Sequence, residues 1–307
     1  GDADKNEADD AKESELSDIP AIDLQAKKFI LYGHDVGSLA VVGTNMERGK
    51  LWRLDTLRIA NESAVLDATG SWRLDGPDRG LSVTPKLDIK NLGGLLDRFD
   101  QHSVSGGQGT VEGKLFWRNM PWHHDKADIE GSMHMSLENG RFVHMSSRTA
   151  RLLELLSLQS MSRLTSLSVN PSGLLKEGFA FDSVTGDLRL AHGVANIDGY
   201  KVSGPAAAIA LEGSTNIVSE IWDLHAVVVP NIDASGAALA TVLVNPVLGI
   251  GAFIGQWLLK QPLARAMTAE YHVHGTWDDP KVDEVETKAP AAQSKEPAAE
   301  TAPAAEH

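Results

Sequence analysis

The sequence predicts a mainly β fold with inserted helices, organised around a long antiparallel sheet. Apolar and polar residues alternate with a period of two over most of the chain, which is typical of strands with one buried face. Short clusters of Gly, Asn and Asp separate several of these runs, as hairpin turns require. Because hairpin turns join neighbouring strands, we expect the strands to form a meander.

The first group of predicted strands lies between Ile19 and Ser146. In the run at 81–90, LSVTPKLDIK, one face carries Leu81, Val83, Leu87 and Ile89. In the run at 109–118, GTVEGKLFWR, one face carries Val111, Leu115 and Trp117. Similar runs occupy 23–32, 38–46, 51–60, 65–74 and 129–137. Turns are predicted at 75–80, 105–109 and 138–140, and a short helical insert, NLGGLLDRFD, at 91–100.

The period changes after Ser146. Leu and Met recur mostly at spacings of three and four with Arg and Glu between them, which predicts an amphipathic helix over 148–165 that packs across the sheet. Strands resume in short pieces at 179–217, where Leu188 and Leu190 share a face, and continue at 222–229. The run AEYHVHGTW at 269–277 predicts a closing strand that returns to the same sheet.

The stretch from Ala234 to Leu259 holds 26 residues without a charge, between Asp233 and Lys260. Asn245-Pro246 near its middle interrupts a helix, so each half is too short to cross a bilayer. We therefore predict a hydrophobic helical hairpin over 234–268. It either contacts a membrane or caps a lipid-filled groove, or it is a buried core helix pair. The residues expected to form the membrane contact or cap are Leu243, Val247, Leu248, Phe253, Trp257 and Leu258.

Charge is concentrated at the two ends of the chain. Residues 1–18 hold eight acids and two lysines, and residues 283–307 hold six acids and two lysines, so both segments are predicted to be disordered. Only −4 of the net charge of −14 is left for a folded domain over 19–282. This mildly acidic domain lacks the excess of Lys and Arg that binding to nucleic acid requires. With no Cys, the chain has neither disulfides nor thiolate sites.

No catalytic, cofactor or metal site is expected. The close His groups are His123-His124-Asp125 and His272-x-His274, and neither has further ligands nearby in sequence. Motifs for acyl transfer, zinc proteolysis and nucleotide binding are absent from the sequence. The sequence therefore favours a protein that is not an enzyme.

Several segments together resemble one protein family. They are SGGQGTVEGKLFWRNMPW at 105–122, the segment at 131–164 that begins GSMHMSLENGRF, the segment at 178–217 that begins GFAFDSVTGDLRL, the apolar stretch, and YHVHGTWDDPKV at 271–282. The chain resembles the C-terminal part of the AsmA-like proteins, in particular their YhdP-type branch. The resemblance covers nearly all of residues 20–282 and consists of loose patterns of Gly, apolar and aromatic positions.

This resemblance implies a long, curved, taco-like sheet whose apolar groove carries phospholipid from the inner to the outer membrane and supports the outer-membrane barrier. It implies a periplasmic segment of a larger polypeptide that is anchored in the inner membrane, with its C-terminal end toward the outer membrane or a protein there. No start Met or signal peptide is present, as expected of such a fragment. The groove residues expected from alternation are Val111, Leu115, Trp117, Leu188 and Leu190.

Two questions stay open at this level. An open groove and the filled interior of a sandwich share the same alternation, so the apolar face is either lipid-lined or ordinary core. The alternative function is a non-enzymatic scaffold for assembly of outer-membrane proteins or envelope machinery. An enzyme acting on envelope glycans or lipids is a third hypothesis, which the missing motifs disfavour.

Overall fold

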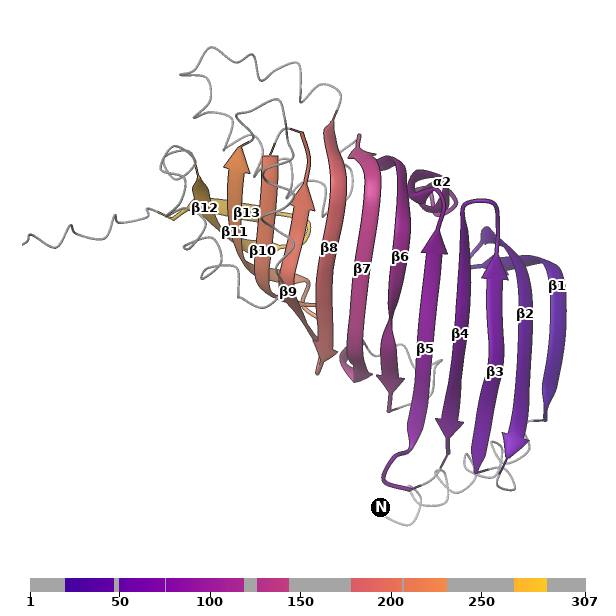
Figure 1. Cartoon of the computed structure of the whole chain (residues 1–307). Helices are drawn as coiled ribbons and strands as arrows, with labels where there is room; N and C mark the ends of the chain where they lie inside the picture. Colours follow the sequence, from indigo (N-terminus) through magenta and orange to yellow (C-terminus); the bar gives the residue numbers. More distant parts are fainter. Residues whose placement is uncertain are drawn as a thin grey trace, which may run out of the picture.

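The computed structural model describes residues 20–46, 50–74, 76–118, 126–143, 178–205, 207–230 and 268–285. These residues form one antiparallel sheet of 13 strands, and the order of the strands in the sheet is their order in the chain (Figure 1). The predicted meander is therefore confirmed. Every hydrogen-bonded neighbour of a strand is the strand before it or after it in sequence.

The strands of the first half are long. Their bounds are β1 Ile22–Leu31, β2 His34–Met46, β3 Leu51–Ala60, β4 Ala64–Arg73, β5 Gly80–Ile89, β6 Val104–Trp117 and β7 Ile129–Phe142. Those of the second half are β8 Phe179–Ala191, β9 Val194–Ser203, β10 Ala207–Asn216, β11 Ile221–Pro230, β12 Ala269–Thr276 and β13 Pro280–Glu284. Helix α2, Leu92–Asp97, follows β5, and a short 3-10 helix, Lys126–Asp128, precedes β7.

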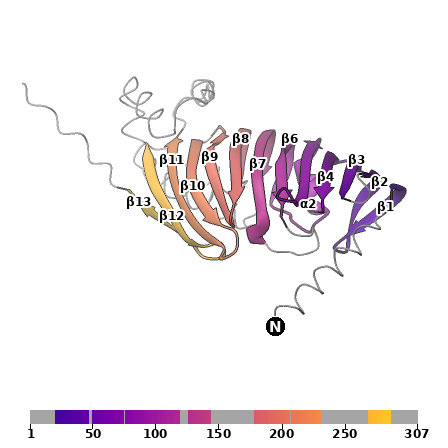
Figure 2. The ribbon, with the colours of Figure 1, turned by 90° about the horizontal axis from the view of Figure 1, so that it is seen from below.

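The sheet is curved. Figure 2 shows it as a bent ribbon that extends from β1 at one end to β13 at the other. The predicted closing strand is confirmed as β12, which pairs along β11 with Val273 opposite Leu224. The predicted helix at 148–165 and the predicted hairpin at 234–268, with its six candidate contact residues, lie outside the described residues.

Two of the predicted turns are wrong. The clusters at 105–109 and 138–140 lie inside β6 and β7, where Gly106 is directly opposite Gly140. Gly106, Gly107 and Asn139 have φ of 65°, 82° and 55°, so both strands bend at this level while their pairing continues as far as Val104. The residue types that allow a left-handed backbone in a turn allow the same bend inside a strand.

The most completely buried side chains belong to the second half of the sheet, from β8 to β12. The largest of them are Tyr271, Phe181, Ile209, Leu224, Val184, Val202, Val228 and Val273. Fully burying an aliphatic side chain of this size contributes about 1.5 to 3 kcal/mol. On β3 to β7, most apolar side chains of the same face are only half-buried, including Leu57, Leu66 and Leu87. The two halves of one continuous face therefore differ in how far they are covered.

Candidate functional site

One face of the sheet carries apolar side chains in rows that cross the strands, and we call it the apolar face. In the first row, successive strands place their residues directly opposite one another because the strands pair in register. This row runs through Leu39, Ile59, Leu66, Leu87, Val111 and Met135, from β2 to β7. Its members come from six consecutive strands, so the row is continuous across the first half of the sheet.

A second row lies beside the first on the same face. It begins with Val41, Leu57, Ala68 and Pro85 on β2 to β5. On β7 to β9 it continues through Met133, Leu188 and Ile197. On the last three strands it consists of Leu224, Val273 and Val282. The apolar face thus extends from β2 to β13.

The five predicted groove residues all lie on the apolar face. Val111 belongs to the first row and Leu188 to the second. Leu115 and Leu190 both lie opposite Gly131 of β7, on either side of it. Trp117 lies between Leu81 and Ile129. All five are half-buried. The geometry therefore brings them together on one surface, and their contact with lipid stays a prediction.

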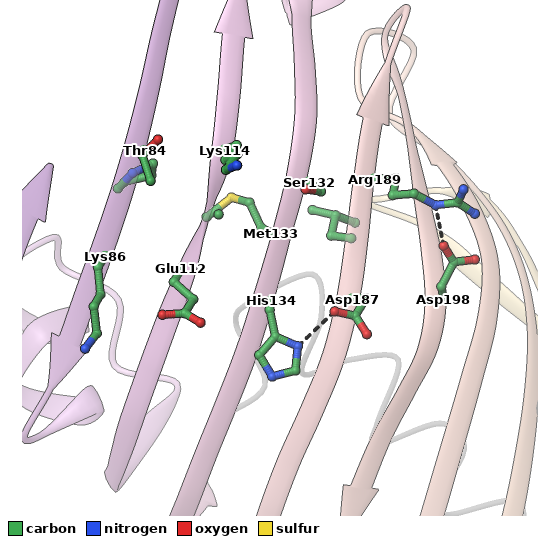
Figure 3. Close-up of a pocket in the computed structure, with 13 residues that line it drawn as sticks. Thr84, Lys86, Glu112, Lys114, Ser132, Met133, His134, Asp187, Arg189 and Asp198 are labelled. Carbon is green, nitrogen blue, oxygen red and sulfur yellow. Dashed lines mark hydrogen bonds and ion pairs between the residues drawn. The ribbon is translucent and has the colours of Figure 1, made fainter. Parts of the chain in front are cut away.

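The opposite face carries a row of charges at the same level as the first apolar row. Its members lie opposite one another on β3 to β9, and the sign of their charge alternates along most of the row. They are Arg58, Asp67, Lys86, Glu112, His134, Asp187 and Asp198. Figure 3 shows Lys86, Glu112, His134 and Asp187 side by side on β5 to β8, around a depression of about 750 Å³. We call this surface the charged face.

Ion pairs connect neighbouring strands across the charged face. Arg58 Nη1 donates to both carboxylate oxygens of Asp67 at 2.7 and 2.8 Å, and His134 Nδ1 lies 2.8 Å from Asp187 Oδ1. Arg189 Nε donates to Asp198 at 2.6 Å, and this hydrogen bond raises the pKa of Arg189. These side chains are largely exposed, so water and salt screen each pair and weaken its contribution to stability. Their effect is to keep this face solvated.

His272 and His274 lie two apart on β12, as predicted, and their rings stack with centroids 5.2 Å apart. Each has its own carboxylate: His272 Nε2 is 2.9 Å from Asp223, and His274 Nε2 is 2.7 Å from Asp283. Among the described residues, His, Asp and Glu form no group of three or more that could hold a metal ion. His123 and His124 lie outside those residues.

Tyr200 is a residue of the apolar face that sequence reasoning missed. Its hydroxyl lies 4.0 Å from Met135 Sδ, next to the first row. Burial raises the pKa of Tyr200 to about 12, so the phenol is neutral and polar within an otherwise apolar surface. A register shift between Thr185 and Asp187 on β8 sets the local pairing with β9. Alternation alone carries no signal for such a shift.

In the part of the chain that the structure describes, no helix has the length and hydrophobicity needed to cross a bilayer.

Comparison with known proteins identifies similar chains. The family model described as YhdP protein matches residues 2–282. The intermembrane phospholipid transporter YhdP of Escherichia coli (strain K12) is 30% identical over 238 residues, which cover 75% of this chain and 19% of that protein. The chain therefore spans about a fifth of the length of this relative. No solved structure matches the chain.

Proposed function

The chain belongs to the YhdP family, and from that membership we propose that it is a phospholipid-conducting segment whose apolar face holds acyl chains. The relative from Escherichia coli is named as an intermembrane phospholipid transporter. We propose that this chain acts in the periplasm as part of an inner-membrane-anchored protein, carries lipid toward the outer membrane, and supports the barrier there. The proposed role is not enzymatic.

The observation that carries this proposal is the contrast between the two faces of a single sheet. Apolar rows cross one face from β2 to β13, and alternating charges cross the other face at the same level. On β3 to β7 most apolar side chains of the apolar face, including Leu57, Leu66 and Leu87, are only half-buried. Removing them from water needs a further apolar partner, and an acyl chain supplies one.

The magnitude of the effect supports a continuous apolar path. Each methylene removed from water contributes about 0.8 kcal/mol, so exposing an acyl chain of about 16 carbons costs on the order of 13 kcal/mol. On a face with polar gaps, the methylenes at each gap would be exposed to water and would lose this stabilisation. Rows that continue from strand to strand remove most of that cost along the whole path.

Photo-crosslinking in cells tests the proposal on adjacent residues. A photoreactive amino acid at Leu188 or Val111, on the apolar face, should capture phospholipid. The matched controls are Arg189 and Glu112, one residue further along the same strands and on the charged face. Capture at Arg189 and Glu112 but not at Leu188 and Val111 would contradict the assignment of the faces. Absence of capture at all four positions would favour the assembly scaffold.

We also propose that the apolar stretch at 234–259, outside the described residues, supplies the contact with the outer membrane or caps the groove. The uncharged composition and the central Asn245-Pro246 support this role. Replacing Phe253 and Trp257 together by Asp should abolish binding to liposomes and lipid delivery, while circular dichroism shows an intact sheet. Loss of the sheet in this variant would mean that the two residues are core instead.

A further inference from the structure

An apolar cavity of about 190 Å³ lies over the β3 to β5 part of the first row, where α2 and the turn after it face the strands. Its lining includes Ile59, Leu66 and Leu87, which are three consecutive members of that row. Leu95 of α2 and Phe99 of the turn line it from the other side. The cavity is therefore continuous with the apolar face.

Helix α2 approaches the sheet closely because two glycines, Gly93 and Gly94, lie in its first turn. A Cβ at Gly93 would come 2.7 Å from the carbonyl oxygen of Val104 on β6, and one at Gly94 would come 2.8 Å from Ser63 Oγ. Asn91 caps the helix, since its Oδ1 accepts a hydrogen bond of 3.0 Å from the backbone N–H of Gly94. The sequence NLGG thus places Leu95 against the strand ends.

Arg98, directly after α2, ties this segment to the strands. Its Nη1 donates to the carbonyl oxygen of Asp35 on β2 at 3.0 Å, and its Nη2 donates to Glu62 Oε1, in the turn between β3 and β4, at 3.1 Å. The side chain is only 23% exposed. These two hydrogen bonds hold the segment after α2 against the strands, so the cavity is preformed. A preformed cavity lowers the free-energy cost of ordering the protein when a ligand binds.

We propose that this cavity receives the terminal carbons of a phospholipid acyl chain that lies along the first row. The inference rests on the proposed function and adds a defined binding position for the end of one acyl chain. An apolar cavity of about 150 Å³ in another protein holds benzene. By that standard, 190 Å³ accommodates about seven carbons of an acyl chain.

The charges around the cavity favour the methyl end of the lipid over its phosphate. A polar hollow beside the cavity is lined in part by Glu62, Asp97 and Arg98. The side chains of Glu62 and Asp97 are 86% and 55% exposed, and they pair with Arg98 and His102, respectively. A phosphate placed here would face two carboxylates. An uncharged chain end meets no such repulsion.

Changing the volume of the cavity tests the inference through the lengths of the bound acyl chains. Leu95→Trp fills the cavity, Leu95→Ala enlarges it, and Leu96→Trp is the matched control because Leu96 does not line it. Each variant of the full chain is purified, its phospholipids are extracted, and their acyl chains are measured by mass spectrometry. Circular dichroism verifies the fold.

We expect Leu95→Trp to shift the bound lipids toward shorter chains, by about fourfold in relative occupancy for each methylene that no longer fits. Leu95→Ala should shift them toward longer chains, and Leu96→Trp should leave them unchanged. If Leu95→Trp does not fold, the inference is tested by the shift in acyl-chain length in Leu95→Ala alone. Bound phospholipid with an unchanged length distribution in the folded Leu95 variants would overturn the inference and leave the proposed function standing. A wild type that carries no phospholipid would count against the proposed function itself.

Discussion

The ring of Tyr200 on β9 lies over Gly186 on β8, in the space that a side chain at Gly186 would occupy. A Cβ on Gly186 would come 2.3 Å from Tyr200 Cδ2. The glycine therefore provides the room in which the aromatic ring packs against its neighbouring strand, a pairing known to stabilise sheets.

The first prediction follows from this contact. Gly186→Ala should destabilise the protein by about 1 to 3 kcal/mol, because the added methyl group overpacks the space that the ring fills. In a Tyr200→Ala background the same change should cost less, since the ring is gone. Urea unfolding of the four proteins of this double-mutant cycle measures the coupling, which should exceed about 0.5 kcal/mol. Additive effects would mean that the ring moves away freely.

The second prediction concerns alkaline pH. The pKa of Tyr200 in the folded protein is about 12, above the ordinary value of 10.0 that applies when the chain is unfolded. A raised folded pKa gives stability that is complete below pH 10 and is lost as the pH rises toward 12. The loss should reach about 2 to 3 kcal/mol. Tyr200→Phe should abolish this part of the pH dependence, whereas Tyr32→Phe, at a residue that is 80% exposed, should not.

The third prediction compares two leucines of the second row. Leu224 on β11 is 2% exposed, whereas Leu57 on β3 is half-buried. Leu224→Ala should lower the free energy of unfolding by about 2 to 5 kcal/mol. Leu57→Ala should lower it by about 1 kcal/mol, because less apolar area leaves the protein interior. Chemical denaturation measures both values. Equal costs would show that the face is covered to the same extent at both ends.

The fourth prediction separates transport from folding. Leu115→Asp places a charge on the apolar face and should reduce the phospholipid bound per chain more than tenfold, because the carboxylate must be desolvated beside acyl chains. Lys114→Asp, one residue away on the other face, should bind lipid as the wild type does. Lipid extraction gives the stoichiometry, and circular dichroism reports on the sheet. Normal lipid content in Leu115→Asp would remove this position from the path.

The sequence allowed most of the sheet to be predicted because alternation is a direct consequence of one buried face. The predicted strand at 51–60 coincides with β3, and the predicted run at 81–90 differs from β5 by one residue at each end. β13 was missed, since Val282 is the one apolar residue of the run PKVDE apart from its initial Pro280. Such a short edge strand leaves almost no pattern to detect.

The candidate site was predictable only in part, for a physical reason. Val111 and Leu115 were assigned to one face of one strand, but the rows across strands depend on register, which local sequence does not encode. The double bend at Gly106 and Gly140 depends on the same register, because each cluster taken alone resembles a turn. The cavity under α2 requires contacts between Leu95 and residues of β3 to β5 that are distant in sequence.

A strand order that follows the chain order makes the sheet extensible. Neighbouring strands are about 4.8 Å apart, so 13 strands extend about 58 Å along the curve. Because each strand bonds only to its sequence neighbours, inserting one hairpin lengthens this distance by about 10 Å and leaves every other pairing unchanged. Duplication or loss of a hairpin would therefore change the length of such a sheet in regular increments and keep its topology.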